Sequence, residues 1–312
     1  MYIKRKIKNM KKLELHNIQF TEALEQFKIR LQTQGTSEGQ VYNKPNSVKE
    51  FLYYLEQNEI TSLAKINQKL INQYFEYLKN RPLQTKDGTM SIGYLKKHRE
   101  AVLRFIEFIK SQYHEIGHGQ SGIQIRINDT DTKPITILLE SEIEQVFNAC
   151  DTSLLGIRDK AILSLLYGCG LRRKELLKLE VHEIDLNKGR VHIDKSKTKY
   201  ARDVPMSKAV QQNIEEYLFN VRNMMLDNNS ELTDFLITER GTKMSDSNMA
   251  KIMEKLSQKT NLGKPITCHL LRHSIATHLH RNMSIEDVAK FLGHRSLDST
   301  MIYTHLKNEY YG

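Results

Sequence analysis

Apolar residues recur at three- and four-residue steps along the first third of the chain, which is the period of amphipathic helices. The clearest runs lie at 51–55, 70–78 and 92–110. Glycine and proline residues occur at 35–39, 45–46 and 81–88, the last of which lies between the second and third runs, and they are typical of breaks between elements. The pattern from about residue 13 to 113 therefore predicts four or five helices and no sheet.

The pattern changes after residues 117–131, which are rich in Gly, Ser, Asn, Asp and Thr and are typical of a linker between domains. Alternating residues at 190–193 and 201–206 predict a β-hairpin, and 235–238 a further short strand. The expected helices cover 160–166, 172–179, 208–226, 245–259, 269–280, 285–292 and 296–305, with another that starts at Ser141 in a capping box with Glu144. The predicted fold class is mainly α with a small β component, divided into a tail (1–12), a helical domain (13–115), a linker (116–134) and a mixed α/β domain (135–312).

Composition excludes several classes of protein. Apolar residues make up 39% of the 312 residues, yet no run approaches the ~18 apolar residues of a membrane span. The basic N-terminus lacks the apolar stretch of a secretory signal, so we expect a cytoplasmic protein, associated with the bacterial nucleoid when bound to DNA. The three cysteines, Cys150, Cys169 and Cys268, form no Cys-x-x-Cys pair, which favours small core residues in a reducing compartment.

The formal net charge of +10 indicates a polyanionic partner such as nucleic acid. The first 135 residues hold 22 Lys/Arg against 14 Asp/Glu, and the remainder 25 against 23. Six of the first twelve residues are Lys or Arg. This run predicts either a solvated tail or an arm that contacts DNA, and charge alone does not separate the two.

Phosphodiester transfer needs a nucleophile, a group that protonates the departing oxygen, and cations around the phosphorus. Arg172 follows a glycine-rich turn at a predicted helix start, where backbone N–H groups and the guanidinium can converge on a phosphate. His269 and Arg272 lie three residues apart on one helix face. His294 follows a Leu-Gly pair, and Tyr303 comes nine residues later. We find no Asp/Glu cluster with metal-ligand spacing, so Arg, Lys and His are the expected cations.

Taken together, Gly-Leu-Arg-x-x-Glu-Leu at 170–176, His-x-Leu-Arg-His at 269–273 and Leu-Gly-His at 292–294 with the later tyrosine resemble the tyrosine recombinase or phage integrase family. The motif-bearing resemblance covers about residues 137–305. It implies that the helical domain is a DNA-binding core-binding domain and that the second domain is catalytic. The six active-site positions are then filled by Arg172, Lys197, His269, Arg272, His294 and Tyr303.

The resemblance also implies a role for each residue. Tyr303 would attack the scissile phosphate to form a 3′-phosphotyrosyl intermediate. Arg172 and Arg272 would bind its non-bridging oxygens, and the histidines would donate hydrogen bonds and assist proton transfer. Glu175 would support the arginines. The phosphotyrosine conserves bond energy, so the chemistry requires no cofactor, metal or ATP.

The lysine of the family is a general acid carried by a hairpin between two strands. Lys197, seven residues before Val204, occupies its usual place. Lys195 or Lys199 takes the role if the turn is shifted by two residues, because side chains alternate along strands and all three can point the same way.

The implied partners are double-stranded DNA with inverted-repeat core sites, three further copies of the chain in a tetramer, and accessory DNA-bending proteins. Only nine residues follow Tyr303, whereas chromosome-dimer-resolving members continue into a helix that docks on the neighbouring subunit. This leaves the link between subunits open and favours a mobile-element integrase or an inversion enzyme. The alternatives are a type IB topoisomerase, a catalytically silent DNA-binding relative, or a zinc site at His269 and His273, for which further ligands are missing.

Overall fold

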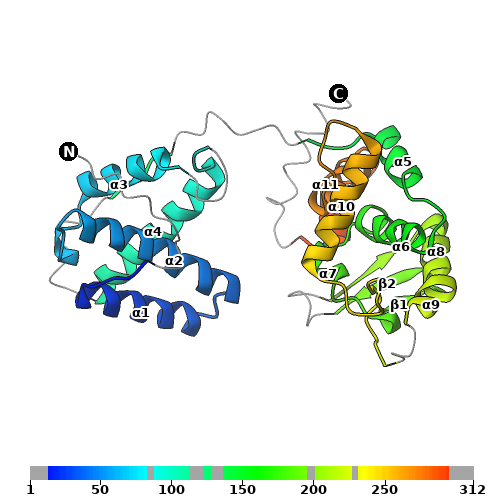
Figure 1. Cartoon of the computed structure of the whole chain (residues 1–312), viewed down its shortest axis with the longest axis horizontal. Helices are drawn as coiled ribbons and strands as arrows, with labels where there is room; N and C mark the ends of the chain where they lie inside the picture. Colours follow the sequence, from blue (N-terminus) through cyan, green and yellow to red (C-terminus); the bar gives the residue numbers. More distant parts are fainter. Residues whose placement is uncertain are drawn as a thin grey trace. The chain divides into compact units, whose positions relative to one another are not determined.

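The computed structural model describes residues 13–82, 88–112, 123–127, 136–194, 201–226 and 231–294. By the proximity of its Cα atoms the chain divides into two compact units, Met1–Lys133 and Pro134–Gly312 (Figure 1). Each unit has its own hydrophobic core. Across the described ranges, every helix is too short or too polar to cross a membrane.

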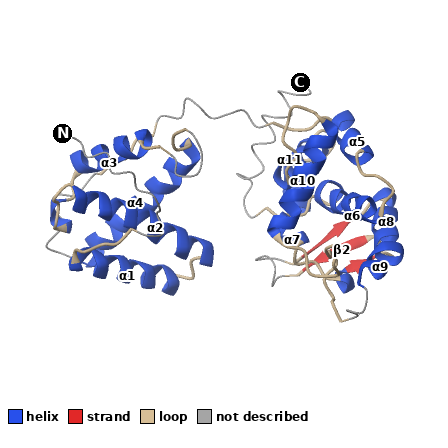
Figure 2. Ribbon diagram, in the orientation of Figure 1, coloured by secondary structure: helices blue, strands red, loops and turns tan. Residues whose placement is uncertain are grey.

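The N-terminal unit is built from helices. Its elements are α1 (Ile18–Thr33), α2 (Glu38–Gln57), the 3-10 turn η2 (Leu63–Lys65), α3 (Gln68–Asn80) and α4 (Ile92–Gln112). Asparagine side chains start two of them, because Asn17 and Asn67 accept backbone N–H groups of the first turns of α1 and α3. The described part of this unit contains no strand (Figure 2), so the prediction of helices without a sheet is confirmed.

The break expected at residues 45–46 is wrong, because Pro45 lies inside α2. Proline removes one backbone hydrogen bond and favours a kink, but the packing of this helix outweighs that cost. Pro45 and Val48 are buried, and Phe51 contributes a fully buried ring to the core. Tertiary packing therefore holds the helix together across a residue that the local sequence marks as a breaker.

A buried polar network crosses the core of this unit. The Tyr74 hydroxyl lies 2.6 Å from His98 Nε2, and Arg81 forms a 2.6 Å ion pair with the fully buried Glu50. Burial, and then the charge of Arg81, lower the pKa of His98 to about 3. His98 is therefore neutral in the folded protein at physiological pH.

The C-terminal unit packs helices around a small sheet. Its elements in order are α5 (Glu140–Asn148), α6 (Leu154–Leu163), the π-helix η4 (Ser164–Gly168), α7 (Arg173–Leu176), the 3-10 turn η5 (Val181–Glu183), β1 (Ile184–Asp185), β2 (Arg190–Ile193), β3 (Arg202–Pro205), α8 (Lys208–Glu215), the π-helix η6 (Glu216–Arg222), α9 (Asn223–Leu226), α10 (Asp246–Thr260), α11 (Cys268–Leu279) and α12 (Ile285–Leu292). The fold class predicted from the sequence, mainly α with a small β component, is confirmed.

The sheet is antiparallel, in the order β1-β2-β3. Val191 pairs with Val204, and Ile193 with Arg202, which confirms the predicted hairpin. The strand expected at 235–238 is wrong, because only an isolated bridge forms between Ile237 and Lys243. Side chains bind part of the backbone of this segment: Tyr217 binds the carbonyl of Phe235 and the N–H of Ile237, and Arg222 binds the carbonyls of Asp234 and Phe235. The N–H of Phe235 donates to the carbonyl of Leu179, outside any strand ladder.

The capping box expected at Ser141 and Glu144 is also misplaced. Helix α5 begins at Glu140, and the N–H of Leu139 donates to Glu142 Oε2 at 2.7 Å. Lys264 holds the same carboxylate at 2.7 Å. The tertiary ion pair therefore selects Glu142 as the residue that caps this helix.

Candidate active site

Arg172 is held at a turn that leads from the π-helix η4 into α7. Its backbone N–H donates to Glu175 Oε2 and its Nη1 to Glu175 Oε1, both at 2.8 Å, while Nη2 donates to the carbonyl of Gly293 at 2.7 Å. The side chain remains 39% exposed. We expected the N–H groups of this helix start and the guanidinium to converge on a phosphate, and the helix to run to residue 179. Instead Glu175 occupies the N–H, and α7 ends at Leu176, so the guanidinium is what Arg172 presents.

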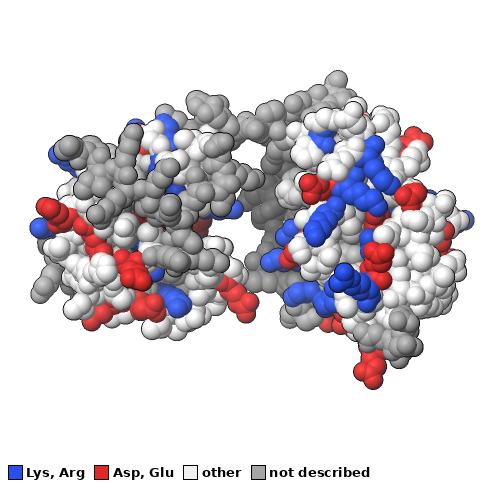
Figure 3. Space-filling view, viewed as in Figure 1, with Lys and Arg blue, Asp and Glu red and all other residues white. Residues whose placement is uncertain are grey.

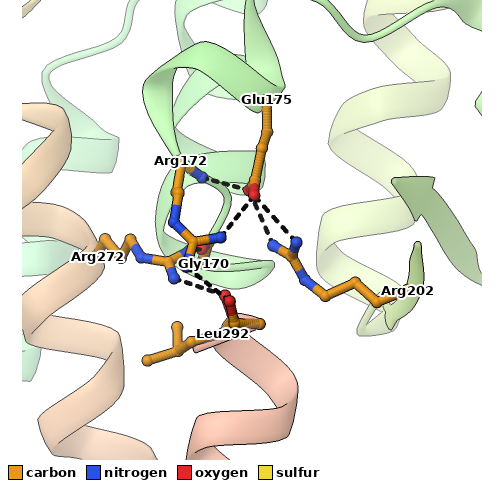
Figure 4. A network of polar contacts seen from close by, with 7 residues as sticks. Gly170, Arg172, Glu175, Arg202, Arg272 and Leu292 are labelled. Carbon is orange, nitrogen blue, oxygen red and sulfur yellow. Dashed lines mark hydrogen bonds and ion pairs between the residues drawn. The ribbon is translucent and has the colours of Figure 1, made fainter. Parts of the chain in front are cut away.

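Arg272 comes from α11 and is only 5% exposed. Its Nη1 donates to the carbonyl of Gly170, and its Nη2 to the carbonyl of Leu292 at 2.6 Å (Figure 4). Gly170 adopts a left-handed conformation with φ of 58°, which glycine tolerates without a steric penalty. The glycine-rich turn and the end of α12 thus orient one guanidinium together.

Glu175 joins Arg172 to a residue that the sequence analysis did not select, Arg202. The Nη1 and Nη2 atoms of Arg202 donate to the two oxygens of Glu175 at 3.0 and 2.8 Å (Figure 4). Burial by itself would raise the pKa of Glu175, but the hydrogen bonds and charge of Arg202, with the contacts of Arg172, lower it to about 2. The strand pattern contained a signal, because Arg202 shares the inward face of β3 with the buried Val204. A charged residue at an inward position requires a buried partner of opposite charge.

The histidines near the arginines are neutral at physiological pH. The Nε2 atoms of His269 and His273 lie 2.7 Å apart, so one of the two rings donates to the other. Burial, followed by the charges of His269 and Arg272, lowers the pKa of His273 to about 4. Burial and Arg272 also lower the pKa of His269. His294, after the C-terminus of α12, has a pKa of about 4 because of burial and then the charges of Arg272 and Arg172.

These residues line one open cavity of about 1070 Å³. Its lining contains Arg172, Arg272, His269, His273 and His294, together with α10 residues that include Met249 and Met253. The described residues contain no group of three or more His, Cys, Asp or Glu side chains placed to hold a metal ion.

Lys and Arg side chains gather in a band over α10 on the face of the C-terminal unit shown in Figure 3. Lys251, Lys255 and Lys259 follow one another along that helix at four-residue steps, and all three are exposed. Charge on this face is of the sign that attracts a nucleic-acid backbone.

The structure therefore brings together four of the six predicted site residues, Arg172, His269, Arg272 and His294. Tyr303, Lys197 and the alternatives Lys195 and Lys199 lie outside the described residues, as does the predicted tail. All three cysteines are free thiols, and burial raises the pKa of each.

Known proteins share both the sequence pattern and the fold. Residues 136–309 match the phage integrase family, and the chain belongs to this family. It is 28% identical over 269 residues to "Tyrosine recombinase XerC" of Oceanobacillus iheyensis, covering 85% of each chain. It is 28% identical over 279 residues to "Tyrosine recombinase XerD" of Listeria innocua, covering 83% of this chain and 93% of the relative.

Among solved structures, the fold is similar to that of the XerH site-specific recombinase bound to palindromic difH substrate in a post-cleavage complex. The TM-score is 0.69 at 18% identity, over 96% of this chain and 90% of that one. The protein is a tyrosine-type site-specific DNA recombinase, and its partner is DNA. The topoisomerase and silent-relative alternatives are not favoured.

Proposed function

We propose that this recombinase cleaves DNA by attack of Tyr303 on the scissile phosphate, and that the 3′-phosphotyrosyl bond is later attacked by a 5′ hydroxyl to rejoin the strands. The observation that carries the proposal is the convergence of two arginines that come from segments 100 residues apart in the sequence. Their guanidiniums are oriented by Glu175 and by the carbonyls of Gly170, Leu292 and Gly293.

Such preorganised cations suit phosphoryl transfer. Negative charge grows on the non-bridging oxygens as the pentavalent transition state forms, and donors that are already oriented need no reorganisation at that moment. Planar guanidiniums match two oxygens of a phosphate and stay charged at any physiological pH. Arg172 and Arg272 therefore stabilise the transition state in this proposal.

The neutral histidines contribute hydrogen bonds and not positive charge. A neutral imidazole both donates and accepts a hydrogen bond, so His269 and His294 can bind phosphate oxygens and assist removal of the tyrosine proton. A free tyrosine has a pKa near ~10, which makes such assistance necessary. Lys197 serves as the general acid that protonates the departing 5′ oxygen.

Cleavage and rejoining through Tyr303 fit a double-stranded DNA substrate with inverted-repeat core sites. Exchange between two duplexes needs four cleavages, and each active site holds one tyrosine nucleophile. A tetramer, with accessory proteins that bend the DNA, would therefore complete the reaction. The exposed lysines of α10 support contact with the DNA backbone.

The nucleophile is tested with a nicked suicide substrate, from which the short cleaved fragment diffuses away and prevents religation. The wild-type protein should form a protein–DNA adduct that resists SDS, and Tyr303→Phe should form none. Tyr310→Phe, which removes a neighbouring hydroxyl of the same kind, serves as the matched control. An undiminished adduct with Tyr303→Phe would refute the assignment.

The lysine is tested with a 5′-bridging phosphorothiolate, whose sulfur leaves without a proton. Lys197→Ala should fail on ordinary DNA and cleave the sulfur-containing strand at nearly the wild-type rate. Parallel Lys195→Ala and Lys199→Ala variants determine the register of the hairpin. Selective rescue of either one instead of Lys197→Ala would move the role to that lysine.

A further inference from the structure

We infer that Arg202 is a positioning residue of the strand-cleavage reaction, which acts by holding Glu175 and through it the guanidinium of Arg172. The inference rests on the proposed function, because it assigns Arg202 to the arginine that binds the scissile phosphate. Arg202 itself is 11% exposed, against 39% for Arg172. Arg202 therefore acts through Glu175 and does not present its own charge to the DNA.

The contact between Arg202 and Glu175 fixes the plane of the carboxylate. Both terminal nitrogens of Arg202 donate to it, one to each oxygen, at 3.0 and 2.8 Å. This parallel two-bond geometry defines orientation as well as distance. Glu175 is 2% exposed, so these bonds form away from bulk water.

The orientation of Arg172 depends on that carboxylate. Arg172 meets the same two oxygens through its backbone N–H and its Nη1, at 2.8 Å each. The Glu175 carboxylate thus binds both guanidiniums, and Arg202 shares the buried negative charge that would otherwise attract Arg172 alone. Without Arg202, Glu175 keeps only Arg172 among these two cations and can rotate toward it, which draws the guanidinium away from the phosphate.

Arg202 also contacts Gly293, the residue that follows α12. A Cβ atom placed on Gly293 would lie 2.9 Å from the Cδ, Nε and Cζ atoms of Arg202, so the two residues are in close contact. Gly293 accepts the hydrogen bond of Arg172 Nη2 and precedes His294. Arg202 therefore contacts both Glu175 and Gly293, the two residues that orient Arg172.

The purely structural alternative is that Arg202 only neutralises a buried acid and stabilises the fold. The two readings differ in how cleavage depends on the charge of the phosphate. Replacing one non-bridging oxygen by a methyl group makes the scissile phosphate neutral, and less negative charge then develops for Arg172 to stabilise. A variant whose defect lies in the position of Arg172 should recover on this substrate, whereas a variant with a damaged fold should not.

The experiment compares Arg202→Met, Arg202→Lys and Arg172→Ala on suicide substrates with an ordinary or a methylphosphonate linkage at the scissile position. Arg190→Met is the matched control, because Arg190 lies on the same hairpin but forms an ion pair at 2.8 Å with Asp203, both 42% exposed. Misplacing a group by about 1 Å costs ~10²-fold in rate, so we expect Arg202→Met to cleave ordinary DNA ~10²-fold more slowly. On methylphosphonate DNA it should lie within about threefold of wild type.

Two further readouts keep the test decisive. The ratio of rates on the two substrates comes from one preparation, so a partly misfolded fraction cancels. If Arg202→Met does not fold, Arg202→Lys keeps the charge but loses the two-bond geometry, and it should show the same recovery. The double variant Arg172→Ala/Arg202→Met should be no slower than Arg172→Ala alone, because residues that act as a unit are not additive.

Equal loss on both substrates, or wild-type cleavage by both Arg202 variants, would overturn the inference. Failure of the proposed function gives a different result. In that case wild type forms no adduct, or Arg172→Ala cleaves ordinary DNA normally, whatever the Arg202 variants do.

Discussion

Gly170→Ala should damage both the stability and the activity of the C-terminal unit, because Gly170 does two things. Its φ of 58° disfavours any side chain, and an added Cβ would lie 2.8 Å from Leu292 Cδ2 and 3.1 Å from Phe291 Cε1. The left-handed conformation costs roughly 1–2 kcal/mol with a Cβ. Overpacking against the fully buried Leu292 adds about 1–3 kcal/mol. We therefore expect a total loss of about 3 kcal/mol, which lowers the melting temperature of a domain of this size by about 10 °C.

Activity should fall further than stability alone explains. The carbonyls of Gly170 and Leu292 are the two acceptors that orient Arg272, and the substitution displaces both of them. Cleavage of a suicide substrate should drop ~10²-fold at a temperature where the variant is fully folded, while DNA binding stays within a few-fold of wild type.

Gly263→Ala is the matched control for stability. Gly263 also has a left-handed backbone, with φ of 67°, but nothing lies within 4 Å of an added Cβ. It should lose only the backbone contribution of roughly 1–2 kcal/mol. Thermal melts of both variants measure the difference. Equal melting temperatures for the two, together with normal cleavage by Gly170→Ala, would refute the reasoning.

Four further predictions concern Arg272, metal dependence, the N-terminal residues and His98. Arg272→Ala should bind DNA within a few-fold of wild type yet cleave ~10²–10³-fold more slowly, since it removes one transition-state donor. The wild-type protein should cleave equally well in excess EDTA. A loss of cleavage that a divalent ion restores would contradict this metal independence. Deleting residues 1–12 should lower the slope of log binding constant against log salt concentration by about 0.9 for each phosphate the tail neutralises. The slope is measured on specific and on random DNA, and an unchanged slope identifies a solvated tail. The folded pKa of His98, about 3, lies below its usual 6.5. The stability that neutral His98 provides is therefore complete above pH 6.5 and is lost as pH falls toward 3. His98→Gln should give a flatter pH dependence of the unfolding midpoint, and an equally steep dependence would show that another group controls the midpoint.

Local patterns predicted the elements well, and they failed where distant residues decide the outcome. Strand β2 (190–193) and helix α12 (285–292) have the predicted bounds, because periodicity and flanking glycines act within a few residues. Helix α7 ends at Leu176 and not at residue 179, and the carbonyl of Leu179 instead accepts the N–H of the distant Phe235.

The candidate site divides in the same way. The spacing of three motifs selected Arg172, His269, Arg272 and His294, which the structure brings to one cavity. Arg202 was missed because its partner Glu175 lies 27 residues away in the sequence, and an isolated arginine in a hairpin full of cations carries no mark of that pairing. The inward position of Arg202 on β3 indicated a buried partner, but only the fold shows that this partner is Glu175.

The carbonyls that hold the two arginines have a consequence for synthesis of the chain. Arg272 requires the carbonyl of Leu292, and Arg172 requires that of Gly293, so neither guanidinium is fixed until the ribosome has released residues beyond α12. Contacts across 102 and 121 residues also form late in folding, because closing such long loops is entropically costly. A nascent or truncated chain that ends before α12 therefore has the Arg172 and Arg272 side chains without their alignment.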